Sequence, residues 1–327
     1  MNLQIRGRVR VLARKKMSNR LFVDVFDEWI ETYKVGAIAE VTLDKYYIAS
    51  KRLWEMVPTL KIANLDRRQY QLIINEYAKT HEIQTTRDFH HQVKSCIKDL
   101  FHDGYLEIDP TYKIVMKGKE PTQKKKPKFM ELQELQEIIR ILDLTKIGMD
   151  WFVLLVAKTG MRYAEALAVT PNDFDFTKGT LTINKSWDHK STKGGFKRTK
   201  TKTSNRTIQI DWQIIGQLGP LIKDLEPDEP IFVEKIADGR YKRVFNSTYN
   251  HHFHQLCQKA GVTVISLHGL RHTHASVLLA HGVSIQAISE RLGHADVGVT
   301  QTTYAHVLND LRQKDNQLIV QTTMGMM

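Results

Sequence analysis

The sequence predicts a mainly α protein, in which a helical domain is followed by a mostly helical domain with a small antiparallel β-sheet. Three observations lead to this prediction. Residues 21–107 carry apolar side chains three and four positions apart, the spacing of amphipathic helices. Residues 129–307 continue with similar helical patterns. Within this second region, two short segments of alternating apolar residues flank a polar stretch with glycines, as paired strands do.

Length and composition favour a two-domain protein with a polyanionic partner. The 327 residues can bury two cores, and 48 Lys and Arg against 36 Asp and Glu give a net charge of +12. That balance favours nucleic acid as the partner. Cys96 and Cys257 are the only cysteines, which excludes a disulfide framework and favours a reducing, intracellular setting. No apolar run is long enough to span a bilayer, so no membrane association is expected.

The first elements are a basic arm and a helical domain. Residues 1–20 hold seven basic residues and no acid, and we interpret them as a basic arm that docks on DNA. Residues 21–110 contain four apolar stripes, hence four helices, with Gly104 expected to end the last one. Residues 111–128 form a basic linker that finishes in the lysine-rich, aperiodic KGKEPTQKKKPK.

The second domain spans residues 129–327. Its first helices are expected in FMELQELQEIIRILDL and DWFVLLVAKTGMRYAEALAV. TLTINKSW and RTIQI are predicted strands of a long hairpin or a small three-stranded sheet. Further helices are expected in STYNHHFHQLCQKAG, LRHTHASVLLAHG and SIQAISERLG, and a tail follows from Thr302.

The stretch LHGLRHTHAS concentrates three histidines around one arginine. His268 and His272 have the four-residue spacing of the H-E-x-x-H zinc motif. Gly269 stands where that motif needs glutamate, however, and no nearby Cys or carboxylate completes a tetrahedral set. A phosphate site fits better, because the guanidinium of Arg271 can grip two phosphate oxygens beside an imidazole. His272 is interpreted as a secondary neighbour and His274 as a packing residue.

Other segments supply side chains suited to the same phosphate chemistry. Residues 184–206, for example, hold eight Lys and Arg and one acid, so a plain solvated loop is a weaker explanation there than usual. The candidate residues are Arg162 and Glu165 in TGMRYAEAL, Lys200 and Lys202 in KRTKTKTSNR, and His294 and Tyr304 in RLGHADVGVTQTTYAHV.

The order Arg, Lys, His-x-x-Arg, Gly-His, Tyr across residues 129–307 resembles the tyrosine recombinase family of the phage-integrase type. The phrases that carry the resemblance are TGMRYAEAL, TKTKTSNRTI, LHGLRHTHAS and LGHADVGVTQTTYAHV. Within the family, these phrases are most similar to integrases of Gram-positive phages and conjugative transposons. The resemblance implies the tyrosine recombinase catalytic fold, preceded by a helical core-binding domain. The implied function is site-specific DNA recombination that integrates or excises a mobile element.

The resemblance also assigns roles. Tyr304 would attack a DNA phosphodiester and form a 3′-phosphotyrosyl intermediate without ATP, metal or any other cofactor. Arg162 and Arg271 would clamp the non-bridging oxygens as negative charge develops. His268 would be the acid/base partner of the tyrosine, and His294 would hydrogen-bond the phosphate.

A hairpin lysine is expected to protonate the leaving 5′ oxygen. Lys200 fits the family pattern, in which Lys-Thr precedes Arg-Thr-Ile, and Lys202 remains an alternative because it repeats the same Thr-Lys rhythm. Thr199 departs from the proline that often precedes this lysine. Glu165 is expected to support the fold around Arg162 rather than touch the substrate.

The implied partner is double-stranded DNA carrying an attachment-site core. We expect a homo-tetramer on DNA and a monomer without it, with the stretch after Tyr304 docking on a neighbouring protomer. An excisionase or a DNA-bending accessory protein is a candidate further partner, and the expected location is the cytoplasm, at the nucleoid. Many such integrases carry an arm-binding domain before the core-binding one. Here residues 1–20 alone stand in that place.

Three alternatives remain open from the sequence. A type IB topoisomerase would share the chemistry but relax supercoils without partner DNA. A non-catalytic DNA-binding regulator would bind DNA without cleaving it. A metal-dependent nuclease would lose its activity in EDTA.

Overall fold

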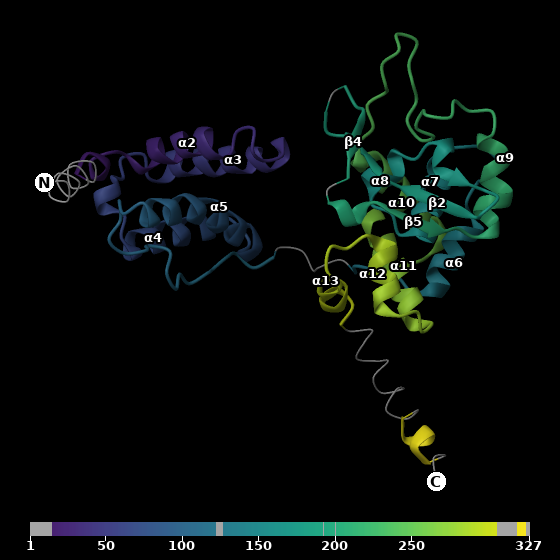
Figure 1. The fold of residues 1–327 in the computed structure, drawn as a ribbon. Helices are drawn as coiled ribbons and strands as arrows, with labels where there is room; N and C mark the ends of the chain where they lie inside the picture. The colour runs from purple at the N-terminus through teal and green to yellow at the C-terminus, as the bar shows by residue number, and fades with distance from the viewer. Residues whose placement is uncertain (1–14, 122–126, 192, 200, 306–318, 325–327) are drawn as a thin grey trace, which may run out of the picture. The chain divides into compact units, whose positions relative to one another are not determined.

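The computed structural model describes residues 15–121, 127–191, 193–199, 201–305 and 319–324. The chain divides into two compact units, Met1–Lys125 and Lys126–Met327. Helices dominate both units, and the second also contains short antiparallel strands, which confirms the predicted fold class (Figure 1). None of the described helices is long and apolar enough to cross a membrane.

The first unit forms where the four apolar stripes were predicted. Its helices are α2 (Phe22–Tyr33), α3 (Glu40–Met56), α4 (Arg67–Ala78) and α5 (Ile83–His102), with the 3₁₀ turn η1 (Ile62–Asn64) before α4. The side chains of the stripes, together with Cys96, are buried in one core. Gly104 follows α5 with a φ of +79°, the left-handed conformation that favours glycine after a helix.

The second unit is built around α7 (Met149–Thr159), whose side chains are buried along most of its length. It packs against α11 (Leu267–Ala280) and α10 (Asn246–Ala260), and α6 (Leu132–Arg140) also packs on α10. A helix that is apolar on every side is stable only inside a core, which explains its central place. Gly160 ends α7 with a φ of +68°, and the short helix α8 (Tyr163–Leu167) follows.

The strands form two small sheets rather than one. The three-stranded sheet has the order β1 (Phe174–Asp175), β2 (Thr180–Ile183), β5 (Arg206–Gln209), all antiparallel. A separate hairpin pairs β3 (Lys185–Trp187) with β4 (Phe196–Arg198). The segment predicted as one strand, TLTINKSW, is therefore split after β2. The reason is packing, because Trp187 is buried in the hairpin against Phe196 and Tyr241.

The remaining elements lie around the sheet and the end of α11. They are the 3₁₀ turns η2 (Pro171–Asp173) and η3 (Lys202–Ser204), the π-helical turn η4 (Ile214–Leu218), α9 (Gly219–Ile222), α12 (Ile285–Leu292) and α13 (Val297–Thr303). Helix α12 contacts α11, α13 and β5 (Figure 1). It therefore joins three chain segments that carry candidate site residues. Residues 319–324 are helical, whereas most of the stretch expected to dock on another protomer lies outside the described residues.

Serine and aspartate side chains fix where α11, α12 and α13 begin. Ser266 accepts a hydrogen bond from the backbone of Gly269 at 3.2 Å, and Ser284 and Asp296 cap the other two helices in the same way. His268 consequently lies inside the first turn of α11, not ahead of it. Gly269 is needed for close packing, because a Cβ there would lie 2.9 Å from the backbone oxygen of Lys128.

Candidate active site

Three arginines from distant parts of the sequence meet at the C-terminal end of α12. The last carbonyls of a helix lack intrahelical partners and carry partial negative charge. Here three successive carbonyls each accept a hydrogen bond from a different guanidinium. The pairs are Arg206 Nε with Arg291 O at 2.6 Å, Arg271 Nη2 with Leu292 O at 2.8 Å, and Arg162 Nη2 with Gly293 O at 3.2 Å.

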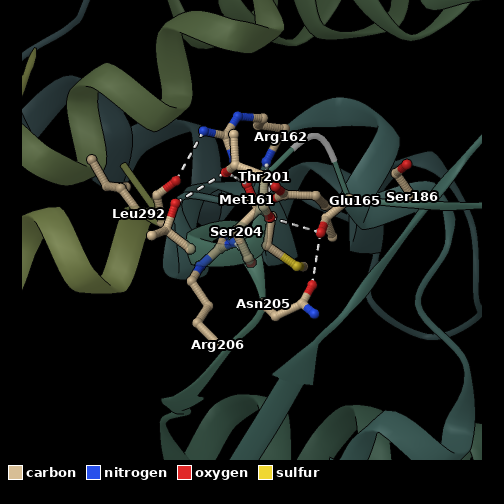
Figure 2. A network of polar contacts seen from close by, with 12 residues as sticks. Met161, Arg162, Glu165, Ser186, Thr201, Ser204, Asn205, Arg206 and Leu292 are labelled. Carbon is tan, nitrogen blue, oxygen red and sulfur yellow. Dashed lines mark hydrogen bonds and ion pairs between the residues drawn. The ribbon is translucent and has the colours of Figure 1, made fainter. Parts of the chain in front are cut away.

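Arg162 is positioned by the carboxylate of Glu165. The guanidinium of Arg162 lies 2.6 Å from Glu165 Oε1, and its backbone N–H donates to Oε2 at 3.0 Å. Burial opposes ionisation of Glu165, but the charges of Arg206 and Arg162 hold its pKa below the ordinary value. The Arg162 side chain keeps 35% of its surface exposed while Glu165 keeps 4%. Arg162 can therefore face a ligand while the buried carboxylate holds it (Figure 2).

Arg206 is a site residue that the sequence analysis did not assign. It lies at the start of β5, and its Nη2 donates to Glu165 Oε2 at 2.9 Å. The same side chain holds the end of α12 and donates through Nη1 to Ser204 O at 2.9 Å (Figure 2). Its side chain is only 6% exposed, so its role is to support the cluster. In the sequence, the feature that could have indicated Arg206 is its position directly after the lysine-rich stretch KRTKTKTSN.

Arg271 is buried, with 3% of its surface exposed. Its Nη1 donates to Gly160 O at 2.7 Å and its Nη2 donates to Leu292 O at 2.8 Å. Burial and the nearby charge of Arg162 lower the pKa of Arg271 to about 9, so it stays charged at neutral pH. A guanidinium has five N–H donors, which leaves three of them for an anion.

Gly160 is essential to this arrangement because nothing larger fits. Its φ is +68°, and a Cβ would lie 2.7 Å from Leu292 Cδ2 and 2.8 Å from His274 Cδ2. We expect Gly160→Ala to lower the free energy of unfolding by about 2 kcal/mol or more, from backbone strain and overpacking together. Urea denaturation followed by near-ultraviolet circular dichroism measures this loss.

Gly282→Ala is the matched control for that substitution. Gly282 has a φ of +82°, and a Cβ there would meet no other atom within 4 Å. We expect this variant to lose only the strain of about 1–2 kcal/mol. Equal losses at the two glycines would contradict the packing role of Gly160.

His274 ties α7 to α12 and does not face the cluster's open side. Its Nδ1 donates to Ala157 O at 2.9 Å, and Arg291 Nε donates to its Nε2 at 2.9 Å. Burial and the charge of Arg291 lower the pKa of His274 to about 3. The neutral ring is therefore a packing and positioning group, close to the role proposed for it from the sequence.

His268 and His294 lie near the arginines from two different elements. His268 is an exposed residue in the first turn of α11, where partial burial of its ring and the charge of Arg271 lower its pKa. His294 follows α12 and shares a hydrogen bond between its Nδ1 and Thr300 Oγ1 at 2.7 Å. Burial and the charges of Arg271 and Arg162 lower the pKa of His294 to about 4. The lowered pKa values favour the neutral form of both rings at pH 7.

Tyr304 directly follows α13 and is 2% exposed. Its ring packs in a small apolar cluster with Ala275, Leu279, Ile288 and Leu292. Burial raises the pKa of Tyr304 to about 12, although Arg271 acts in the opposite direction. Its hydroxyl lies 3.1 Å from Nδ1 of His272, the histidine to which the sequence analysis gave only a secondary place.

The candidate general acid is only partly covered by the structure. Lys200 lies outside the described residues, and Lys202 begins the turn η3. Neighbouring residues attach this turn to the arginine cluster, since Ser204 accepts from Arg206 and a Cβ on Gly293 would lie 3.1 Å from Ser204 Cα. The chain between β4 and β5 is thus anchored at the end of α12 where Ser204 lies.

Among the described residues, no three His, Cys, Asp or Glu side chains are grouped so that they could hold a metal ion. The cluster instead combines cationic guanidinium groups, neutral imidazoles and a phenol. Such a set can bind a phosphate, stabilise charge that develops on its oxygens, and offer a hydroxyl nucleophile.

Comparison with known proteins agrees with this chemistry. Residues 128–310 match the model of the phage integrase family. The integrase of Staphylococcus phage L54a is 25% identical over 97% of this chain and 98% of its own length. Tyrosine recombinase XerC of Bacillus subtilis (strain 168) is 26% identical over 89% of this chain and 93% of its own. The solved Tn1549 transposon integrase, in complex with transposon right-end DNA, shares the fold with a TM-score of 0.72, covering 92% of this chain and 100% of that one at 15% identity.

Proposed function

Because this chain belongs to the phage integrase family and is a tyrosine-type site-specific recombinase, we propose that Tyr304 is its nucleophile on double-stranded DNA. The observation that carries this proposal is the shared end of α12. Leu292 belongs to the same small apolar cluster as Tyr304, and its carbonyl accepts a hydrogen bond from Arg271. The next carbonyl holds Arg162. A phosphate bound by these arginines therefore lies beside the phenol.

The remaining roles follow from charge and exposure. Arg162 and Arg271 bind the non-bridging oxygens and stabilise the charge that builds on them during in-line displacement. The charges of both arginines act on His294 and His268, which supports the proposal that these histidines hydrogen-bond the same phosphate. The role of His268 as the acid/base partner of Tyr304 stays a prediction from the sequence.

The reaction needs no external energy source in this scheme. Attack by the phenol forms a 3′-phosphotyrosyl bond and releases a 5′ hydroxyl, and religation to another strand reverses both changes. The phosphodiester energy is conserved, so ATP is not consumed. Guanidinium groups carry out the charge neutralisation that metal ions perform in other phosphoryl transfers. Integration or excision of a mobile element is the proposed outcome.

The first unit and the tail extend this proposal to partners. Residues 21–110 are proposed as the core-binding domain, residues 111–128 as a linker along the DNA backbone, and residues 1–20 as a basic arm or the remnant of an arm-binding domain. The net charge of +12 and the DNA in the Tn1549 integrase complex support a DNA partner. A tetramer on DNA, exchange of the C-terminal tail, an excisionase or DNA-bending accessory protein, and action at the nucleoid are proposed with it.

The central test is a covalent protein–DNA adduct formed in EDTA. Duplexes that the chain binds are selected from a random-sequence library and rebuilt with a nick moved one nucleotide at a time, so that cleavage becomes irreversible. We expect a denaturation-resistant adduct on the selected duplexes. Binding without an adduct would favour a regulator. EDTA-sensitive cleavage would favour a nuclease, and relaxation of plasmids that lack the selected site would favour a topoisomerase.

The same duplexes identify the general acid. We expect Lys200→Ala to lose cleavage by about 10²–10⁴-fold, as removal of a proton donor does, and Lys202→Ala to retain it. A 5′-bridging phosphorothioate restores the Lys200 variant, because its sulfur leaves without a proton. The reverse pattern would move the assignment to Lys202. Rescue of neither variant would remove the hairpin lysines from this role.

A further inference from the structure

Helix α11 places two imidazoles one turn apart, and only one of them meets the nucleophile. The Tyr304 hydroxyl lies 3.1 Å from Nδ1 of His272. The rings of His268 and His272 stand perpendicular with centroids 5.1 Å apart, and among the described residues no hydrogen bond joins His268 to Tyr304. His272 is thus the imidazole in contact with the reacting oxygen.

The ionisation states of the two rings allow the phenol to donate this hydrogen bond to His272. Burial raises the pKa of Tyr304 to about 12, so the phenol keeps its proton at neutral pH. Burial and the neighbouring His268 and Arg271 lower the pKa of His272 to about 4, so its ring is neutral. In the tautomer that carries the ring proton on Nε2, the phenol donates and Nδ1 accepts. This is the arrangement from which a proton can move from oxygen to nitrogen.

We propose that His272 is the catalytic proton acceptor for Tyr304. As Oη bonds to phosphorus and the bond from phosphorus to the 5′ oxygen breaks, the phenol proton moves to Nδ1 of His272. The 5′ oxygen takes its proton from the hairpin lysine. In religation the 5′ hydroxyl attacks phosphorus and gives its proton back to the lysine, while the bond from phosphorus to Oη breaks and His272 returns its proton to the phenolate. This inference rests on the proposed function and replaces His268 in that one step.

The charges around His272 explain why we expect the proton transfer from Tyr304 to occur only when DNA is bound. The groups that face its ring are His268 and Arg271 on α11, Lys128 ahead of α6, His294 after α12, and Tyr304 itself. Two of these are cations, two are imidazoles and one is the neutral phenol, so the free protein disfavours an imidazolium at His272. A bound phosphodiester brings negative charge that offsets Arg271 and raises the proton affinity of His272. Substrate binding therefore prepares the acceptor.

The same contact has a rival interpretation as a latch that only keeps the phenol buried. A latch slows cleavage, so its removal accelerates the reaction or leaves it unchanged. A proton acceptor does the opposite. The two roles consequently predict opposite directions for one substitution.

The test is single-turnover adduct formation on the selected nicked duplex, in EDTA, from about pH 5 to pH 9. We expect His272→Ala to be slower than wild type by about 10²–10⁴-fold, with part of the rate restored by added imidazole. His272→Asn keeps an acceptor oxygen near the place of Nδ1 but cannot take a proton, so it stays slow. The wild-type rate should fall as the pH drops and His272 becomes protonated, and that acid limb should weaken in His272→Asn.

A 5′-bridging phosphorothioate separates this role from that of the lysine. It removes the need to protonate the leaving group and so rescues the lysine variant, whereas it leaves His272→Ala slow. His281→Ala is the matched control, because it deletes an exposed imidazole at the far end of the same helix. We expect wild-type rates from it.

Several results would overturn the proposal: His272→Ala as fast as wild type or faster, full activity of His272→Asn, or rescue of His272→Ala by the phosphorothioate. If circular dichroism shows that His272→Ala does not fold, the cleavage rate and pH profile of His272→Asn distinguish the proton acceptor from the latch. Absence of an adduct from wild type is a different outcome, since it would remove the proposed function as well as the role of His272.

Discussion

Tyr304→Phe is expected to abolish covalent adduct formation while DNA affinity stays at the wild-type value. The substitution deletes the oxygen that we propose attacks phosphorus but keeps the ring, which belongs to the apolar cluster with Leu279, Ile288 and Leu292. We expect the rate to fall by at least about 10⁴-fold, the scale seen when a nucleophile is removed. Single-turnover cleavage of the nicked duplex and an electrophoretic mobility shift measure the two properties.

The fold should tolerate this change, which makes the result interpretable. One hydrogen bond, to His272, is lost, and such a bond contributes about 1 kcal/mol. Tyr33→Phe is the matched control, since that tyrosine lies exposed on α2 with 55% of its surface accessible. An adduct of undiminished yield from Tyr304→Phe would transfer the nucleophile to another residue and end the present assignment.

The candidate site residues were selected from the sequence by their order and by the family resemblance, and two of them, Arg162 and Arg271, meet at the end of α12. The motif around Arg162 and the stretch from His268 to Arg271 stand out as cationic side chains at helix starts. The helical stripes of α2 to α5 were equally predictable, because burial on one face imposes a spacing of three and four residues. Local patterns of this kind need no knowledge of the tertiary structure.

The supporting contacts were not predictable, because they join residues far apart in the chain. Arg206 donates hydrogen bonds to Glu165 and to a carbonyl at the end of α12. The residues near position 206 in the sequence do not indicate either partner. The choice between His268 and His272 has the same origin. Both rings lie on α11, and only the position of α13 decides which one meets Tyr304. The division of the predicted strand likewise depends on the distant partner of Trp187.

These unpredicted contacts share a physical principle. The carbonyl end of α12 offers several acceptors within a few ångströms, and three guanidinium groups satisfy them. Packing like charges together is costly, and the lowered pKa of Arg271 reflects burial and the proximity of Arg162. A bound phosphate relieves that repulsion. The repulsion between these arginines in the absence of DNA therefore favours the binding of an anion.

Arg271→Lys is expected to reduce cleavage by about 10²–10³-fold, the cost of losing a donor aimed at developing charge. Two different nitrogens of Arg271 bind Gly160 O and Leu292 O. One ammonium cannot hold both carbonyls at those positions and still face a phosphate, because it is a compact point charge on a flexible stem. Because the substitution leaves the net charge unchanged, the loss of cleavage reflects the changed positions of the N–H donors.

Two measurements distinguish a cleavage defect caused by the changed position of the cation from one caused by a destabilised fold or by weaker DNA binding. A buried carbonyl left without its donor costs about 1–3 kcal/mol, so thermal unfolding is expected to shift to lower temperature. DNA affinity, set mainly by the many other basic groups, is expected to change little. Arg140→Lys is the control, because Arg140 is an exposed residue paired with Glu137 on α6. If Arg271→Lys cleaved at the wild-type rate while folded, the two-carbonyl anchor would not position the guanidinium for catalysis.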